Sequence, residues 1–374
     1  MTEKIRLITD AAGLQQLADA ISAAPRVAID TEFHSERRHR PELMLLQIAT
    51  DAETAWLVDP KAIHPAPLGA ALSASALLLH GGQQDVAILN DMIGLTPERT
   101  LDTQISAGLL GDHYPDRLST LALDHLDRPV DKSATLTDWS SRPLSQKQLR
   151  YAADDALVLF PLAEALEKKL SALGRQEWAW EATAEMVDMV LMPPRSVTFW
   201  QDWEIASRML PEEWQTLGVL RDWRAKLAAR QGRPDYAVLP NGILIDLARR
   251  RPTSKRSLMA NRRVHTGFVR HNGAALLQQI HDALEVDGVP SPPTRAERLV
   301  ADALLLWATV VGAREQIAPR LLMPPYLRMG IAQGQRQLGG WREPFQAALE
   351  NFLDGCEGLT LSGNPPTITT CRST

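Results

Sequence analysis

The chain has 374 residues, of which 45% are hydrophobic and 23% are charged, and its formal net charge is −5. These are the values of an ordinary globular protein, and the length predicts two or three domains. No apolar run approaches the roughly 18 residues that span a bilayer, no basic-then-apolar leader begins the chain, and the 2 cysteines exclude a disulfide framework. We therefore expect a cytoplasmic protein with no membrane partner and no obligate protein partner.

The first 192 residues alternate between strand and helix patterns. Short apolar and β-branched runs predict strands at KIRLIT, RVAIDTEF, LMLLQIAT, TAWLVD and SALLLHGG. Apolar residues at helical spacing predict helices at AAGLQQLADAISAA, at QQDVAILNDMIG and from Leu144 to about Leu191, with a break near Pro161. Three early strands followed by strand–helix alternation predict an α/β domain over residues 1–192, with a mixed sheet flanked by helices.

The remaining chain is predicted to form two all-α domains separated by proline-rich linkers. MPPRS ends the first domain, and PSPPT divides the helical patterns that follow it. The expected helical domains cover residues 209–289 and 295–360. Residues 361–374 lose the apolar pattern, and we expect them to be disordered.

Acidic side chains occur at three points of the predicted α/β domain. Asp30 and Glu32 stand two residues apart at the end of a strand, so both point to one face, where a divalent cation between them would relieve their repulsion. Asp85 begins the helix after SALLLHGG, and Tyr151 and Asp155 lie one helical turn apart. Taken singly, each feature is better explained by solvated acids at a strand end, in a first helical turn or on an exposed helix edge.

Together and in this order, these residues match a known pattern. The chain resembles the DEDD exonuclease superfamily in its tyrosine-bearing branch: Asp30-Thr31-Glu32 matches the first motif, Asp85 the second, and Tyr151 with Asp155 the third. Longer runs resemble the ribonuclease D family, namely AIDTEF, LLQIAT, LDTQISAGLLG, DKSATLTDWSSRPLS and QLRYAADDALVLFPL. This resemblance implies a ribonuclease H-like mixed sheet in the first domain.

The second domain resembles a further module. The run LRDWRAKLAARQGRPDYAVLPNGILIDLARRRPTS is similar to an HRDC domain, the helical nucleic-acid-binding module shared by some helicases and ribonuclease D. We expect the HRDC domain over residues 209–289 and a second, HRDC-like helical domain over residues 295–360.

The resemblance also implies a reaction. It implies hydrolysis of RNA from the 3′ end with release of nucleoside 5′-monophosphates and two divalent metal ions, Mg²⁺ or Mn²⁺. Asp30 and Asp155 would hold the ion that generates the nucleophile, Asp30 would also reach the second ion, Glu32 would support the nucleophile side, and Asp85 would support the second ion. Tyr151 has too high a reference pKa, about 10, to be a general base at neutral pH, so we interpret its hydroxyl as orienting the attacking water.

Other residues of the first domain are candidates for substrate contact. Phe33 would stack on a terminal base or belong to the core, and His80 would touch the substrate or be a hydrogen-bonded structural histidine. Lys132 and Arg142 lie in the loop-like stretch before Tyr151, which we expect to position the last helix or to grip phosphate. Asp102 is predicted either to support the acidic site or to cap a helix.

The net charge hides a strongly basic segment. Between Arg221 and Arg270 there are 13 lysines and arginines against 3 acids, which gives 13 − 3 = +10. This excess predicts a phosphate-binding surface, with a solvated helical face as the alternative. The candidate substrate-binding residues flank predicted turns: Arg250, Arg251, Lys255 and Arg256.

The predicted function is therefore 3′→5′ trimming of RNA, with transfer-RNA precursors and other structured small RNAs as the expected partners. A DNA-directed 3′→5′ exonuclease of repair or proofreading type is the first alternative, because the four acids do not choose the sugar and the sequence identifies no 2′-hydroxyl contact. A non-catalytic RNA-binding adaptor is the second alternative. It is disfavoured because such a protein would be expected to have lost some of the acids.

Overall fold

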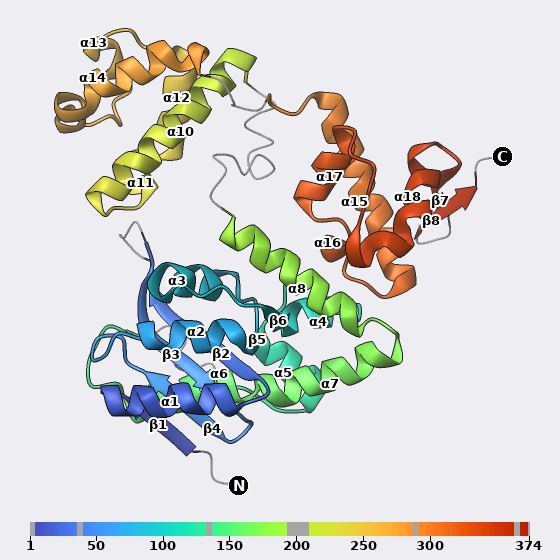
Figure 1. Ribbon diagram of the computed structural model, residues 1–374. Coiled ribbons are helices and arrows are strands. Elements are labelled where there is room, and N and C mark those ends of the chain that lie inside the picture. The colour runs from blue at the N-terminus through green and yellow to red at the C-terminus, as the bar shows by residue number, and fades with distance from the viewer. Residues whose placement is uncertain are drawn as a thin grey trace. The chain divides into compact units, whose positions relative to one another are not determined.

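The computed structural model describes residues 4–35, 40–131, 137–192, 209–286, 291–362 and 367–372 (Figure 1). The chain divides into two compact units. The first contains residues up to 34, residues 43–192 and the chain from residue 300 onward, and the second is formed mainly by residues between 209 and 299.

A six-stranded mixed sheet forms the centre of the first unit, in the order β1-β4-β3-β2-β5-β6. The strands are β1 (Lys4–Ile8), β2 (Val27–His34), β3 (Glu42–Ala49), β4 (Thr54–Val58), β5 (Ala76–Leu79) and β6 (Arg99–Asp102). Strand β1 is parallel to β4, β4 is antiparallel to β3, and β5 is parallel to both β2 and β6. The mixed sheet and its first five strands confirm the prediction, whereas the short edge strand β6 was not predicted.

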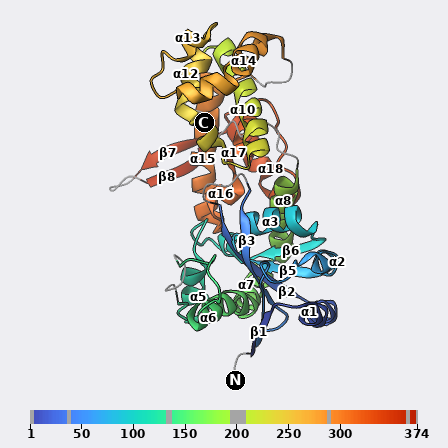
Figure 2. The same ribbon diagram turned by 90° about the vertical axis from the view of Figure 1, so that its left-hand side faces the viewer.

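Helices cover both sides of this sheet. They are α1 (Ala11–Ala23), η1 (Ala66–Leu68), α2 (Gly69–Ala74), α3 (Gln83–Ile93), α4 (Thr103–Gly108), α5 (Leu118–Leu126), α6 (Gln146–Leu157), α7 (Leu159–Ala172) and α8 (Gln176–Leu191). Figure 2 shows α1, α2 and α3 on one side of the sheet and α5, α6 and α7 on the other. The predicted break near Pro161 falls between α6 and α7, and Pro161 lies in the first turn of α7, where a missing N–H costs no helical hydrogen bond.

The first residues of strand β2 belong to the hydrophobic core, and the strand then reaches the edge of the sheet where the acids lie. Val27, Ala28 and Ile29 are buried, as expected for a strand with helices on both faces. The apolar run then changes to polar residues at Asp30. Because β2 and β5 are parallel, their carboxyl ends reach the same edge, and the residues that follow both strands converge there.

The C-terminal region packs onto the α/β domain instead of forming a separate domain. It contains α15 (Arg295–Glu315), α16 (Pro319–Leu322), α17 (Pro325–Ala332), η4 (Gly340–Phe345), α18 (Gln346–Leu353), β7 (Glu357–Ser362) and β8 (Thr367–Arg372). Trp307 is fully buried in the same hydrophobic core as Leu17 of α1. The N–H of Ala318 donates to the carbonyl of Gly108 at 2.7 Å, and a Cβ added to Gly108 would lie only 2.5 Å from Leu321 Cδ1. Glycine at position 108 therefore permits this docking.

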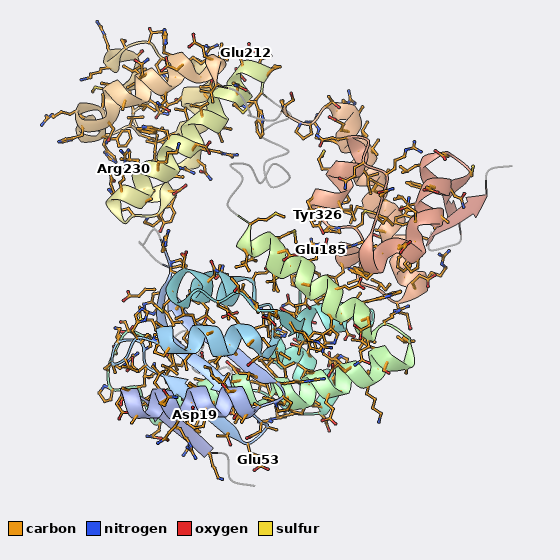
Figure 3. The ribbon with its side chains drawn as sticks, viewed as in Figure 1. Asp19, Glu53, Glu185, Glu212, Arg230 and Tyr326 are labelled. Atoms are coloured by element: carbon orange, nitrogen blue, oxygen red, sulfur yellow. The ribbon has the colours of Figure 1, made fainter. Side chains whose placement is uncertain are left out.

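A buried polar contact also joins the two parts of the first unit. Arg342 is 6% exposed, and its Nη1 donates to Glu185 Oε2 at 2.6 Å. The hydroxyl of Tyr326 on α17 donates to the other oxygen of Glu185 on α8 (Figure 3). A buried arginine is stable only when its charge and N–H groups are satisfied, so this contact fixes how the C-terminal region docks.

The chain end differs from the expected disordered tail. Strands β7 and β8 form an antiparallel hairpin, with Glu357 opposite Arg372 and Ser362 opposite Thr367. The sequence TITTC is rich in the β-branched residues that favour strands, but a two-stranded hairpin has little core of its own, so its pattern gives a weak signal.

The second unit is helical, as predicted for residues 209–289. Its elements are α10 (Pro211–Gln231), α11 (Asp235–Val238), α12 (Asn241–Arg250), α13 (Lys255–Leu258), α14 (Thr266–Asp282) and η3 (Ala283–Glu285). Trp214, Leu220, Leu244 and Leu276 contribute to a core of its own. Among the described residues of the whole chain, no helix is long and apolar enough to cross a membrane.

Candidate active site

Strand β2 supplies the first two acids of the site. Asp30 and Glu32 follow the buried residues of β2 and are themselves half-buried. Their i, i+2 spacing directs both carboxylates to one face of the strand. Thr31, between them, is buried and donates its hydroxyl hydrogen bond to Asp85 Oδ1.

Helix α3 supplies the third acid. Asp85 lies in its first turn, directly after the Gly81-Gly82 turn, and is 8% exposed. Asp102 fixes this turn, because its carboxylate accepts the N–H of Gly81 at 3.1 Å and that of Gly82 at 2.9 Å. Asp102 also caps α4 through Gln104 N at 2.8 Å. Asp102 therefore does both things: it caps helix α4, and it supports the turn that carries Asp85.

Helix α6 brings Tyr151 and Asp155 to the same place from the other side of the sheet. The helix begins with a capping box in which Ser145 Oγ accepts Gln148 N at 3.2 Å. Asp155 is 7% exposed, and a hydrogen bond from Tyr151 favours its ionised form. Asp154 is half-exposed and pairs with Arg128 at 3.5 Å instead.

Strand β2 and helix α6 both contribute to the wall of a cavity of about 690 Å³, and Asp85 of α3 is joined to this wall through Thr31. Its lining residues are Asp30, Thr31, Glu32, His80, Arg117, Leu118, Ser119, Val130, Asp131, Tyr151, Asp155 and Leu159. The structure thus brings together residues from β2 and α6 that are more than a hundred positions apart. Arg117, Ser119 and Asp131 were not predicted as site residues, because no local motif distinguishes them from ordinary surface positions.

Burial and mutual repulsion make this group of acids hard to ionise. Burial, together with the charges of the other three acids, raises the pKa of Asp30 well above its usual value. Burial also raises the pKa of Glu32 to about 8, that of Asp155 to about 7 and that of Asp85 to about 6. Carboxylates this close together in a poorly solvated site favour either protonation or a bound cation.

The donor set suits a hard divalent cation. All four strongly shifted acids offer carboxylate oxygens, the ligands that Mg²⁺ and Mn²⁺ prefer. Across the described residues, no three histidine, cysteine or acidic side chains already surround one common point. One oxygen of Asp85, Oδ1, accepts the Thr31 hydroxyl. The other oxygen of this carboxylate is not engaged by Thr31.

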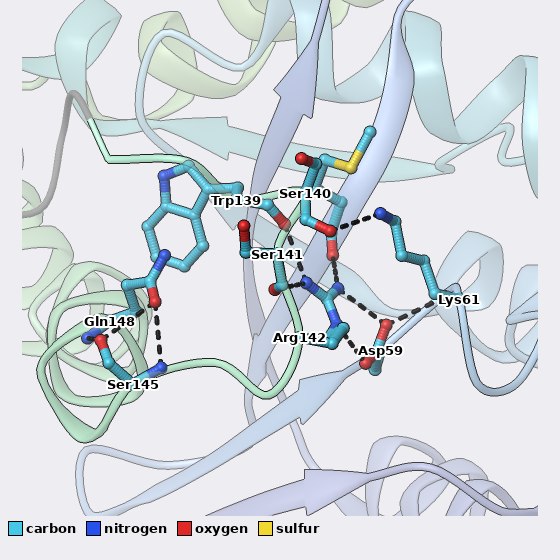
Figure 4. A network of polar contacts seen from close by, with 9 residues as sticks. Asp59, Lys61, Trp139, Ser140, Ser141, Arg142, Ser145 and Gln148 are labelled. Carbon is cyan, nitrogen blue, oxygen red and sulfur yellow. Dashed lines mark hydrogen bonds and ion pairs between the residues drawn. The ribbon is translucent and has the colours of Figure 1, made fainter.

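Arg142 does not reach into the cavity, and the prediction that it grips phosphate is wrong for this structure. Its Nε donates to Asp59 Oδ2 at 2.5 Å and its Nη2 to Asp59 Oδ1 at 2.8 Å (Figure 4). Its remaining bonds reach the carbonyls of Met44, Trp139 and Ser141, at 2.7, 2.8 and 2.8 Å. Nε, Nη1 and Nη2 are therefore all engaged within the protein. The alternative role, positioning of the last helix, fits this geometry.

Trp139 links the Arg142 network to the cavity. It is 2% exposed, and its ring centre lies 6.0 Å from that of Tyr151, tilted by 45°. Lys61 adds a further contact, because its Nζ donates to the carbonyl of Ser140 at 2.6 Å. The loop before α6 is thus tied to β3 and β4 on one side and packs against Tyr151 on the other.

The other predicted contacts of the first domain have different outcomes. His80 lines the cavity, but its Nδ1 lies 3.0 Å from Thr103 Oγ1 and its Nε2 lies 3.1 Å from the Asp116 carbonyl. This is the hydrogen-bonded structural histidine of the alternative reading. Phe33 is partly buried and packs against the main core, which favours its core role. Lys132 lies outside the described residues.

The four basic residues predicted to bind substrate in the second unit lie around α12 and α13. Arg250 pairs with Asp246 at 2.5 Å, so its charge is already offset. Arg251 ends α12 in the left-handed backbone region, and Lys255 and Arg256 are exposed at the start of α13. The structure therefore distinguishes Arg250 from the other three predicted residues.

Comparison with known proteins adds to this geometry. The chain matches a 3′-5′ exonuclease family model over residues 5–171 and an HRDC domain model over residues 215–280. It is 30% identical to ribonuclease D of Pseudomonas paraeruginosa, covering 94% of this chain and 98% of that protein. It is 32% identical to ribonuclease D of Zymomonas mobilis, with 90% of each chain covered. The chain belongs to the ribonuclease D family.

Solved structures agree with this assignment. The structure of Escherichia coli RNase D, described as an exoribonuclease involved in structured RNA processing, superposes with a TM-score of 0.81 at 25% identity and covers 94% of this chain and 99% of that one. The catalytic core of RRP6 from Trypanosoma brucei is 21% identical with a TM-score of 0.56, covers 76% of this chain and 80% of that one, and shares the fold. As a ribonuclease D family member with a 3′-5′ exonuclease domain, the protein is a hydrolytic 3′→5′ exoribonuclease.

Proposed function

We propose that this exoribonuclease trims the 3′ ends of structured small RNAs, with transfer-RNA precursors as its main substrates, and that it uses two divalent metal ions, Mg²⁺ or Mn²⁺. The metal-dependent part is supported by the raised pKa of four carboxyl groups, of which Asp30, Glu32 and Asp155 line one cavity and Asp85 accepts a hydrogen bond from Thr31 of the same lining. The long helical region beyond the α/β domain supports a structured substrate, because it offers a second surface for the RNA body.

Four residues are assigned to hold the ions: Asp30, Glu32, Asp85 and Asp155. When bound, two such ions activate the attacking water and stabilise the leaving oxygen of the phosphodiester. The carboxylates contribute negative charge that largely offsets two divalent cations, and their burial strengthens that attraction. The Thr31 hydroxyl donates a hydrogen bond to Asp85 and so holds this acid next to strand β2.

Tyr151 is assigned to orient the attacking water. Its hydrogen bond to Asp155 favours the ionised carboxylate, and its ring packs against Trp139. A neutral phenol held in this way offers a hydrogen bond of fixed direction and needs no change of protonation state during the reaction.

The second unit is assigned to hold the body of the RNA. Arg251, Lys255 and Arg256 lie close together in the chain, next to Arg250, which is paired with Asp246. HRDC domains are nucleic-acid-binding modules, and exposed cations of this kind contact phosphates without reading sequence. A cytoplasmic location remains the expectation from the composition.

The test is a degradation assay with a 3′-extended transfer RNA and a DNA of the same sequence, in Mg²⁺ or in EDTA, with products resolved at single-nucleotide steps. We expect stepwise shortening of the RNA in Mg²⁺, mononucleotide products and no reaction in EDTA. Asp155→Asn serves as the inactive control.

Other outcomes of this assay would overturn separate parts of the proposal. Faster shortening of the DNA would favour the DNA-directed alternative. Full activity in excess EDTA would remove the metal ions from the mechanism, and internal cleavage products would show an endonuclease.

A further inference from the structure

Arg117 places a positive charge at the wall of an otherwise acidic cavity. Among the described residues that line the cavity, it is the one lysine or arginine, and Asp30, Glu32 and Asp155 belong to the same lining. The residue is exposed, and within the described chain its guanidinium has no ion pair or side-chain hydrogen bond. No described side chain pairs with the Arg117 guanidinium, although several carboxylates share its cavity, and this points to a ligand.

The backbone of Arg117 is held firmly in place. Its N–H donates to Asp116 Oδ1 at 2.7 Å, and the Asp116 carbonyl accepts Gln104 Nε2 at 2.6 Å and lies 3.1 Å from His80 Nε2. Gln104 belongs to α4, which Asp102 caps, and Asp102 also fixes the turn before Asp85. Arg117 and Asp85 are thus anchored through one hydrogen-bonded network.

A second polar group lies next to Arg117. Arg117 is the N-cap of α5, and its side chain does not cap the helix. Ser119, in the first turn of α5, lines the cavity, and its Oγ is buried without a hydrogen-bond partner. A buried hydroxyl without a partner costs free energy, and the cost is removed when a ligand supplies an acceptor.

Among the described residues of this lining, Arg117 is the one that offers the substrate a permanent positive charge. His80 is the other basic side chain there, but burial lowers its pKa, and both ring nitrogens lie within hydrogen-bonding distance of protein atoms. The remaining charged groups of the lining are acids, including Asp131. A nucleic acid strand that enters this cavity brings more than one phosphate, and a phosphate next to the scissile one needs a cation of its own.

We propose that Arg117 binds the phosphate on the 5′ side of the scissile one, with the Ser119 hydroxyl as a further donor. The guanidinium would donate two parallel hydrogen bonds to the non-bridging oxygens of that phosphate. The contact sets the register of the strand, so that the 3′-terminal linkage lies at the carboxylates. This inference rests on the 3′→5′ trimming proposed above and names a residue that binds the substrate.

The proposed contact between Arg117 and the phosphate is equally strong in the bound substrate and in the transition state. This determines how its loss should change KM and kcat. Loss of a contact of equal strength in both states raises KM and leaves kcat nearly unchanged. For Arg117→Gln we expect KM to rise by about tenfold, with kcat within about twofold of wild type. The slope of log affinity against log salt should fall by about 0.7, the value for one phosphate contact on a single strand.

The decisive experiment removes the charge from each partner in turn. A single-stranded oligoribonucleotide is made with a neutral methylphosphonate at the phosphate that precedes the 3′-terminal linkage, and release of the first nucleotide is followed. The sugar on the 5′ side of that phosphate is 2′-deoxyribose in both the modified and the unmodified oligonucleotide, which keeps the linkage stable. Wild type, Arg117→Gln, Arg117→Lys and Lys168→Gln are compared; Lys168 is an exposed cation of α7 outside the cavity lining.

We expect the methylphosphonate to raise KM about tenfold for wild type and for Lys168→Gln, but by less than about twofold for Arg117→Gln, because the partner is already gone. Arg117→Lys should recover part of the affinity. Equal effects of the methylphosphonate on wild type and Arg117→Gln would overturn the assignment. If wild type fails to release a 3′ nucleotide from the unmodified oligonucleotide, the proposed function fails instead, so the two failures are distinguishable.

Discussion

The guanidinium of Arg142 holds the carboxylate of Asp59 through two hydrogen bonds, of 2.5 and 2.8 Å, and thereby ties the loop before α6 to the end of β4. Burial opposes ionisation of Asp59, but the hydrogen bonds from Arg142 and from Lys61 N–H keep its pKa below the usual value. Since Trp139 of the same loop packs against Tyr151, this ion pair positions a residue of the site that it does not touch.

The first prediction concerns this pair. Arg142→Ala should lower the free energy of unfolding by about 2–3 kcal/mol, because it leaves a poorly solvated carboxylate without its partner. Arg142→Lys keeps the charge but loses the two-pronged geometry, so we expect an intermediate loss. For Asp59→Asn, the difference from wild type should shrink as the pH falls below about 4, since the stabilisation from a depressed pKa is lost on protonation. Urea unfolding at several pH values provides the measurement, and a difference that does not change with pH would contradict it.

The second prediction separates two neighbouring acids. Asp155 is 7% exposed and lines the cavity, whereas the partly exposed Asp154 pairs with Arg128 and is not in the cavity lining. Asp155→Asn should reduce turnover by on the order of a hundredfold or more, since loss of groups behind a metal ligand alone costs about 10–100-fold. Asp154→Asn should stay within about twofold of wild type. Steady-state kinetics with thermal denaturation as a folding control will decide, and an inactive Asp154→Asn variant would show that the third motif is aligned wrongly.

The third prediction concerns the Tyr151 hydroxyl. Tyr151→Phe keeps the ring that packs against Trp139 but removes the hydrogen bond to Asp155. We expect kcat to fall by about tenfold while RNA affinity stays within about twofold, because only the chemical step uses the hydroxyl. Single-turnover rates and equilibrium binding in Ca²⁺ are the two measurements. A large loss of binding would assign the hydroxyl to the substrate instead.

The fourth prediction concerns pH and metal removal. In the metal-free protein, burial raises the pKa of Glu32 to about 8 and that of Asp155 to about 7. The folded state then holds protons that the unfolded state releases near pH 4, so the free energy of unfolding should fall as the pH rises from about 4 to about 8. Mg²⁺ binds the ionised carboxylates and should raise the melting temperature more at pH 8.5 than at pH 5.5. Melting curves in EDTA and in Mg²⁺ test this, and an equal Mg²⁺ effect at both pH values would speak against these ligands.

The fifth prediction concerns the basic surface of the second unit. Truncation after residue 192 is a poor test, because it also removes the region from residue 300 onward that packs into the first unit. Point variants avoid this problem. For Lys255→Gln, the slope of log affinity for transfer RNA against log salt concentration should become shallower by close to one unit. Arg250→Gln is the matched control, since the Arg250 guanidinium is already engaged by Asp246. Equal slopes for Lys255→Gln and wild type would mean that this surface does not contact RNA.

The sequence by itself determined the local elements and the chemistry of the acids. The buried run Val27–Ile29 specifies a central strand, because only a strand covered on both faces is apolar throughout. The two-residue spacing of Asp30 and Glu32 and the four-residue spacing of Tyr151 and Asp155 place each pair on one face, since strand and helix periodicities fix side-chain direction. The resemblance to the DEDD exonuclease superfamily predicts that these pairs belong to one site.

Only the tertiary structure shows which residues, far apart in the sequence, contact one another. Arg142 lies in a stretch that the sequence associates equally with phosphate binding and with support, and the pairing with Asp59, 83 residues away, settles its role as support. The amphipathic pattern of the C-terminal helices does not predict which element they pack against. The hydrogen bond from Ala318 N–H to the Gly108 carbonyl shows that they pack against the α/β domain. No sequence motif marks Arg117 as a substrate-binding residue. Its candidate role follows from its place in the cavity lining, which only the folded chain shows. Periodicity reports the face of a single element, whereas the partner of that face depends on chain segments brought together by folding.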